Sequence, residues 1–252
     1  MAASNETGRT ARIDAAGIYY KELNRQLCQL ADEGVSRVEL QNVCGQRYIG
    51  TGLKKPLEIE ITGTPGNDLG VFMDGPKITV HGNAQDGCGN TMNAGEIIVH
   101  GHAGDTIGLS ARGGKILVRD DVGYRAGIHM KEYRETKPKL VIGGTAQDFV
   151  GEYMAGGILV LLGLNGRKEQ PANFIGTGMH GGVIYLRGGV ESYQLGREVG
   201  TAALEETDWR ILKELLDEFT AHFGGEAGKM KKQDFIKLLP LWLRPYGKIY
   251  AY

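Results

Sequence analysis

One short phrase recurs seven times between residues 50 and 188: a Gly, an apolar residue three positions later, often a Gly pair, a β-branched run and a closing Gly. The leading glycines are spaced 19 to 25 residues apart, at Gly50, Gly70, Gly89, Gly108, Gly127, Gly151 and Gly176. A period of about twenty residues with one strand per period is typical of a solenoid, in which each coil buries its apolar face only against its neighbours. We therefore predict a mainly β fold, a parallel β-helix of about seven coils.

Two columns of the repeat predict the core. The fourth and second residues before each closing position are aliphatic in every coil: Ile59/Ile61, Ile78/Val80, Ile97/Val99, Ile116/Val118, Leu140/Ile142, Leu159/Leu161 and Ile184/Leu186. This alternation is typical of a strand with one buried face. The residue three positions after the leading Gly is apolar in every coil and most often Met, whose flexible side chain fills irregular space in a core. We predict that this second column is buried at a corner of each coil: Leu53, Met73, Met92, Ala111, Met130, Met154 and Met179.

The N-terminal end differs in kind from the repeat. Residues 16–34 place apolar side chains at helical spacing and stop at Gly34, which predicts an amphipathic helix. Residues 35–43 predict a leading strand. Because an open terminal coil presents unpaired strand edges, we expect this segment to cap the solenoid.

The C-terminal end is also predicted to be helical. Residues 205–225 predict a helix that begins near Thr207 or Asp208 and ends at a Gly pair, and residues 233–242 predict a second helix, interrupted by Pro240. The expected organisation has three parts: a cap at 1–40, a β-helix at 41–190 and a helical extension at 191–252.

The outward residue between the two buried ones becomes apolar along the rod: Glu60, Thr79, Ile98, Leu117, Val141, Val160 and Tyr185. The last five predict a continuous apolar stripe, which a monomeric protein rarely leaves in water. Either the C-terminal helices of this chain or another subunit covers it. The five stripe residues are therefore candidates for docking a partner, together with inserts at 131–138 and 165–171, which extend coils five and six.

Composition narrows the class of protein. The chain has 252 residues and a net charge of −1, so electrostatics give no reason to expect nucleic acid or a membrane surface. The polar N-terminus does not resemble an export signal, and no apolar run reaches the roughly 18 residues of a membrane span. We expect a cytoplasmic protein. Its three cysteines, without a C-x-x-C pair, predict reduced thiols and no iron–sulfur or zinc set.

Histidines on adjacent coils are the candidate metal ligands. His81 and His100 lie at the same phase of the repeat, so their rings are expected one strand spacing apart, about 4.8 Å. Arg119 takes the next place in the ladder and opposes a cation there. A catalytic zinc site also needs three protein ligands. We interpret the column as an exposed ladder, with zinc bound at His81 and His100 as the alternative.

Asn and Asp recur three residues before the leading Gly: Asn67, Asp86, Asp105, Asp148 and Asn173. Such residues accept hydrogen bonds from backbone N–H groups at tight corners, and that is our interpretation. A lining that binds cations or polarises ammonia is the alternative.

Residues 176–181 form a formal G-x-G-x-x-G. A strand follows them, whereas a dinucleotide fingerprint must open a helix. We predict no bound nucleotide and assign no catalytic residue.

Three stretches carry a family resemblance: GNTMNAGEIIVHGHAGD at 89–105, EYMAGGILVLLG at 152–163 and NFIGTGMHGGVIYLRGG at 173–189. Over roughly residues 40–190, the chain resembles the GXGXG domain, the right-handed β-helix at the C-terminal end of the glutamate synthase large subunit. In that family a cysteine amidotransferase releases ammonia from glutamine, and a barrel with FMN and an iron–sulfur cluster makes glutamate from 2-oxoglutarate. The β-helix braces these two parts and is not itself catalytic.

The chain shows none of those catalytic parts, since residue 2 is Ala where an N-terminal Cys nucleophile is needed. It resembles the free-standing form of the domain. The resemblance implies a noncatalytic scaffolding subunit of a split glutamate synthase-type complex, with amidotransferase and flavin/iron–sulfur subunits as partners and FMN and the cluster bound by them. Alternatives are a subunit of N-methylglutamate synthase or formylmethanofuran dehydrogenase, or a self-contained metal-binding enzyme. Self-association is left open.

Overall fold

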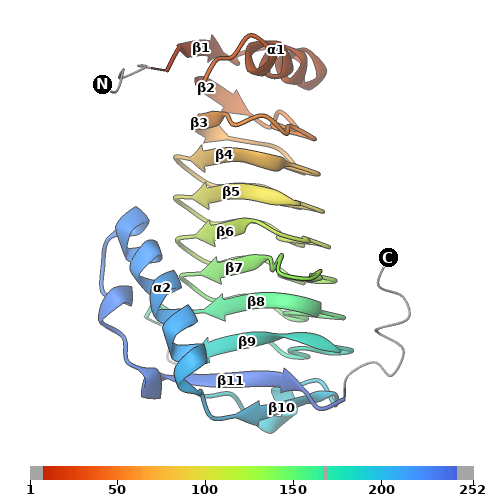
Figure 1. Ribbon diagram of the computed structural model, residues 1–252, viewed down its shortest axis with the longest axis vertical. Helices are drawn as coiled ribbons and strands as arrows, with labels where there is room; N and C mark the ends of the chain where they lie inside the picture. Colours follow the sequence, from red (N-terminus) through yellow and green to blue (C-terminus); the bar gives the residue numbers. More distant parts are fainter. Residues whose placement is uncertain (1–7, 167–169, 243–252) are drawn as a thin grey trace, which may run out of the picture.

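A computed structural model describes residues 8–166 and 170–242 as a tall stack of strands, with one helix across its N-terminal end and a second along one side of its lower half (Figure 1). No helix in the described ranges is long and apolar enough to cross a bilayer. The elements are β1 (Thr10–Asp14), α1 (Tyr20–Asp32), β2 (Arg37–Cys44), β3 (Glu58–Thr64), β4 (Asp74–Val80), β5 (Ala94–Val99), β6 (Lys115–Val118), β7 (Lys139–Ile142), β8 (Ala155–Leu161), β9 (Gly181–Arg187), β10 (Val199–Ala202), α2 (Glu206–Phe223) and β11 (Phe235–Pro240), with short 3₁₀ turns at Ser192–Gln194, Ala227–Lys229 and Lys232–Asp234.

The strands form one sheet in the order β1-β2-β3-β4-β5-β6-β7-β8-β9-β11-β10. From β1 to β9 every pairing is parallel and between consecutive strands, as a solenoid requires. The register matches the repeat, with Ile78 opposite Ile59 and Ile97 opposite Ile78. The predicted parallel solenoid is confirmed, although seven repeated strands, β3 to β9, delimit six turns between them and not seven coils.

Both predicted core columns are buried. The fourteen aliphatic strand residues are each at most 2% exposed, and the corner column is at most 7% exposed. The leading glycines are explained by the same packing. At Gly89 the backbone has φ +71°, and an added Cβ would lie 2.2 Å from Cδ1 of Ile116. A side chain at this corner would therefore both strain the backbone and collide with the core column.

The N-terminal cap is confirmed. Helix α1 buries Leu23, Leu27 and Ala31 on one face, against the same core cluster that runs through the solenoid. Its C-terminal end is followed by Gly34 at φ +77°. The leading strand is β2, and β1 adds one more parallel strand beyond it, so the chain covers its own first coil.

The C-terminal segment differs from the prediction in two respects. Helix α2 is present, but its N-cap is Glu205, because Asp208 occupies the third position of a capping box and accepts the Glu205 N–H at 2.8 Å. The expected second helix at 233–242 is wrong. That segment forms β11, which pairs antiparallel with β9 and β10 and closes the last coil (Figure 1). Residues 243–252 and 167–169, the latter within the predicted insert at 165–171, lie outside the described residues.

Candidate functional site

Helix α2 covers the apolar stripe. All five stripe residues are at most 1% exposed and share a cluster with Leu212, Leu216 and Phe219 of α2 (stripe: Ile98, Leu117, Val141, Val160 and Tyr185). The interpretation of these five residues as partner-docking candidates is therefore wrong, because the chain buries them itself. Gly143 makes room for this packing, since a Cβ there would lie 2.6 Å from Cζ of Phe219.

A buried polar triad holds α2 to the sheet. The Tyr185 hydroxyl of β9 donates to Oδ1 of Asp208 at 2.7 Å, and Nζ of Lys237 on β11 donates to Oδ2 at 2.7 Å. Burial raises the pKa of Asp208, but hydrogen bonds from Lys237, Tyr185 and the Glu205 backbone N–H outweigh it and leave that pKa below its ordinary value. The carboxylate thus stays charged and links three separate elements.

The histidine ladder is present as predicted. The rings of His81 and His100 stack with centroids 5.4 Å apart, and Nε2 of His81 lies 2.6 Å from Oε2 of Glu60. His100 also meets the edge of Phe223, the last residue of α2, at 5.0 Å. Burial, with the positive charges of His81 and Arg119, lowers the pKa of His100. The ladder therefore favours a neutral His100 against the helix end.

A different trio lies close enough to share a metal ion. Glu96, Glu218 and His222 bring ligand atoms within 4.8 Å of one another, and neither His81 nor His100 belongs to this group. Lys115 lies between the two carboxylates: its Nζ is 3.4 Å from Oε1 of Glu96 and contacts Oε1 of Glu218. The lysine already supplies the positive charge that these carboxylates need, so the trio is best described as an ion-pair network.

The corner ladder of Asp residues serves the turns. Oδ1 of Asp86 accepts the N–H of Asp105 at 2.9 Å, and Oδ1 of Asp105 accepts the N–H of Tyr124 at 2.9 Å. Asp148 does the same for Asn173 at 2.8 Å. Each carboxylate thus satisfies a backbone donor of the following coil. This confirms the structural interpretation of these aspartates as acceptors for backbone N–H groups at the corners.

Aromatic and cationic side chains gather at the corners of the last coils, at positions two before and two after the leading Gly, with Tyr124 three before it. We call this group the corner patch; it consists of Tyr124, Arg125, His129, Phe149, Tyr153 and Phe174. The rings of Phe149 and Phe174 stack at 4.9 Å, those of His129 and Tyr153 at 5.4 Å, and the Arg125 guanidinium lies 5.4 Å from the Phe149 ring. Phe174 is 50% exposed and Tyr153 is 47% exposed. The patch is thus an exposed surface on the last coils.

The corner patch is held in an unfavourable backbone conformation. Arg125, His129, Phe149, Tyr153 and Phe174 all have φ between +51° and +67°. Bulky side chains rarely adopt this left-handed region, at a cost of about 1–2 kcal/mol per residue, and Gly, Asn or Asp fit it better. Coils near the N-terminus place Asp68 and Gly87 at the equivalent corner. The sequence could have revealed the patch as a run of bulky residues at positions where most earlier coils use small or polar ones, Tyr48 and Phe72 being the exceptions.

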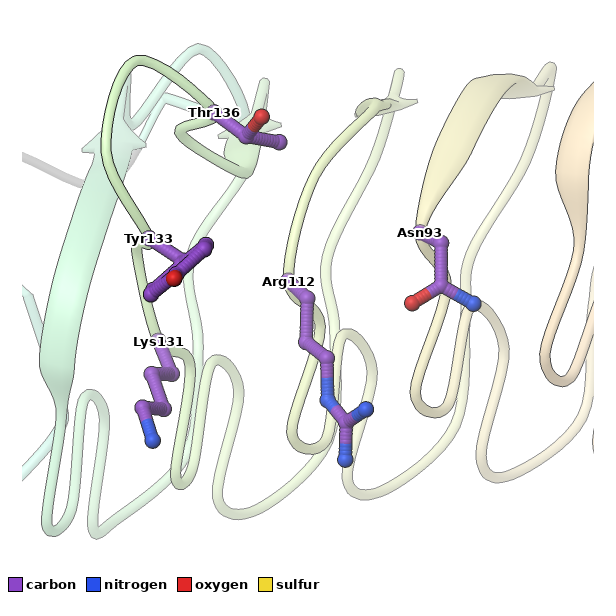
Figure 2. A pocket seen from close by; sticks show the side chains of 5 residues that line it. All are labelled: Asn93, Arg112, Lys131, Tyr133 and Thr136. Atoms are coloured by element: carbon purple, nitrogen blue, oxygen red, sulfur yellow. The ribbon is translucent and has the colours of Figure 1, made fainter. Parts of the chain in front are cut away.

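A pocket of about 490 Å³ lies under the insert of coil five, lined by Asn93, Arg112, Lys131, Tyr133 and Thr136 (Figure 2). The first three occupy the same phase of consecutive coils, four residues after the leading Gly. The insert 131–138 folds into a small hairpin, in which Tyr133 and Thr136 exchange backbone hydrogen bonds of 3.0 and 3.1 Å. The sequence indicates the insert but does not show that it folds back over the neighbouring coil.

Comparison with known proteins agrees with the fold. The family model described as GXGXG motif matches residues 33–245, which is most of the chain. An uncharacterized protein of Methanocaldococcus jannaschii, MJ1350, is 49% identical over 249 residues, covering 95% of this chain and 95% of that protein. The match therefore extends through both capping ends as well as the repeats.

Proposed function

Because the chain belongs to the GXGXG motif family, we propose that it is a scaffolding subunit of a glutamate synthase-type complex and that a partner subunit docks on the corner patch. The resemblance to the β-helix of the glutamate synthase large subunit supports the type of complex. The partners in this proposal are an amidotransferase that releases ammonia and a flavin/iron–sulfur oxidoreductase that consumes it. FMN and the iron–sulfur cluster belong to the latter.

The corner patch is the observation that carries the docking part of the proposal. Tyr, Phe and Arg side chains are enriched at the centres of protein interfaces, where a few of them supply most of the binding energy. Here they are exposed, stacked in register and fixed by the solenoid backbone, so little side-chain freedom remains to be lost on binding. Maintaining them in left-handed conformations lowers the stability of the free chain, a cost that binding to a partner offsets.

The capped ends of the rod support the scaffolding part. Helix α1 and strand β1 close one end, while β10 and β11 close the other, so the ends do not add further coils (Figure 1). Helix α2 buries the outward apolar stripe of β5 to β9. Within residues 8–166 and 170–242, no helix or strand covers the corner side of the last coils. A rigid rod with such a surface can hold two partner subunits in a fixed relation.

The test is affinity purification of the tagged chain from its native cytosol, with mass spectrometry and absorption spectra of the retained proteins. The proposal predicts recovery of a cysteine amidotransferase and of a yellow-brown flavin and iron–sulfur protein. Recovery of a molybdenum-type oxidoreductase instead would assign the chain to another complex built on the same scaffold. A chain recovered alone with stoichiometric zinc would contradict the scaffolding role and redirect attention to His81 and His100.

A further inference from the structure

The pocket under the insert is lined by two cationic side chains and by no acidic one. The side chains of Arg112 and Lys131 make no hydrogen bond or ion pair with any residue that the structure describes, and the five lining residues include no carboxylate. Nearby arginines behave differently: Arg119 pairs with Asp120 at 2.8 Å, and Arg125 pairs with Glu152 at 3.2 Å. Two cations that share a pocket without a counter-charge repel each other unless an anion joins them.

The solenoid fixes the distance between these cations. Arg112 N donates to Met92 O at 2.8 Å, and Lys131 N donates to Ala111 O at 2.9 Å, so the two residues stand on consecutive rungs, about 4.8 Å apart at the backbone. Asn93 stands one rung earlier. Figure 2 shows the Arg112 and Lys131 side chains pointing the same way from neighbouring turns, with the Asn93 amide on the far side of Arg112.

The insert forms the remaining wall, and the fold is adapted to receive it. At Gly113 an added Cβ would lie 2.6 Å from Cγ2 of Thr136 and 2.1 Å from the Asn93 carbonyl oxygen, so only Gly lets the hairpin return this closely. The hairpin carries two acidic residues, Glu132 and Glu135, and neither lines the pocket. Oε2 of Glu132 accepts the N–H of Gly157 at 3.0 Å, and Glu135 is exposed. Glu132 thus anchors the hairpin to the next coil and leaves the pocket cationic.

We propose that this pocket binds a small free oxyanion, a dicarboxylate or a phosphate-bearing metabolite. A guanidinium fork matches carboxylate and phosphate oxygens in pairs, and the ammonium adds a second charge one rung away. Asn93, Tyr133 and Thr136 line the same pocket, and their amide and hydroxyl groups can donate neutral hydrogen bonds. The volume of about 490 Å³ lies within the range of small-molecule sites. This site is separate from the corner patch and does not depend on the proposed partners.

The test uses the purified full-length chain, titrated with inorganic phosphate and with succinate in a calorimeter and by NMR. We expect saturable binding of one equivalent of at least one of these anions, weakened by added NaCl, with shifts at the amides of Arg112, Lys131 and Thr136. Arg112→Gln and Lys131→Gln should each weaken it about tenfold or more, since each removes a hydrogen bond to a charged group.

Lys54→Gln is the matched control. Lys54 is an exposed lysine at the same phase of the first coil, where no insert covers the column, so its loss should leave binding unchanged. Thermal melting of all three variants checks that each is folded. The proposal is overturned if neither anion binds saturably, or if Lys54→Gln weakens binding as much as Arg112→Gln. It is also overturned if the pocket variants impair retention of a partner protein while neither anion binds, because the cations then meet an acidic segment of that partner.

Discussion

The outward strand face and the corner columns of this solenoid both carry apolar side chains in register, but only the strand face is covered. Helix α2 packs on the strand face and buries Phe219 to 1% exposure, whereas Phe174 on the corner is 50% exposed. The covered face contributes to the stability of the chain. The corner residues instead adopt left-handed backbone angles, which lower stability, so their identity points to binding and not to folding.

The largest expected effect comes from breaking the covered face. Phe219→Ala removes a fully buried ring that touches the stripe, and we expect a loss of about 3–5 kcal/mol in the free energy of unfolding, with increased binding of a hydrophobic dye. Urea denaturation measures the free energy of unfolding. Phe174→Ala is the matched control at the corner and should change the same quantity by no more than about 0.5 kcal/mol. Equal losses of unfolding free energy in the two variants would contradict the distinction between a stabilising strand face and a corner that does not stabilise the fold.

The buried triad should be the next most sensitive feature. Asp208→Asn removes the charge shared by Tyr185 and Lys237, and we expect a loss of about 1.5–3 kcal/mol. Because the pKa of Asp208 in the folded chain is lowered, its contribution is complete above the unfolded value of about 3.9 and is lost as the pH falls below it. Stability measured from pH 6 to pH 3 should decline less steeply in Asp208→Asn than in the wild type. Parallel curves would show that the triad does not hold α2.

A third variant isolates the backbone cost at the corner. Phe72 is 55% exposed at φ +57° and lies on the same column as His129 and Tyr153, but on an earlier coil, away from the corner patch. Asn tolerates the left-handed region, so Phe72→Asn should raise the free energy of unfolding by up to about 1 kcal/mol. Phe72→Ala separates loss of the ring from relief of the backbone. A decrease of more than about 0.5 kcal/mol in Phe72→Asn would mean that the exposed ring stabilises the fold.

The smallest effect concerns the junction of the histidine ladder with α2. The pKa of His100 is lowered by burial and by neighbouring positive charges, so the unfolded chain binds the proton more readily than the folded one. Stability should therefore fall as the pH drops through the unfolded value of about 6.5. Melting temperatures between pH 7.5 and 5.5 should show this decline, reduced in His100→Asn. A decline of the same size in His100→Asn would mean that other titrating groups cause the loss of stability.

Periodicity predicts the solenoid well because each coil repeats the same strand, corner and core positions. The strand columns, the Met column and the turn role of Asp86 and Asp105 all follow from residues at a fixed phase. The segment at 233–242 was misassigned because a short apolar run without clear periodicity fits a strand or a helix equally well. Its pairing with β9 is decided by the open end of the sheet, a contact that no local pattern shows.

The candidate functional surfaces are harder to predict from the sequence for a related reason. The stripe was visible in the sequence, but whether α2 or a partner covers it depends on packing between distant segments. The pocket exists only because the hairpin at 131–138 returns over Arg112, which requires the missing side chain of Gly113. The corner patch combines residues from three coils, and its exposure becomes evident only once the left-handed corners are placed.

The most direct test of the proposed docking is hydroxyl-radical footprinting of the aromatic side chains, on the free chain and on any complex recovered by affinity purification. The account predicts that Tyr124, Tyr153 and Phe174 lose reactivity in the complex, while Trp209 and Phe223 of α2 keep the reactivity that they have in the free chain. Protection confined to α2, with the corner unchanged, would contradict the assignment of the corner as the docking surface.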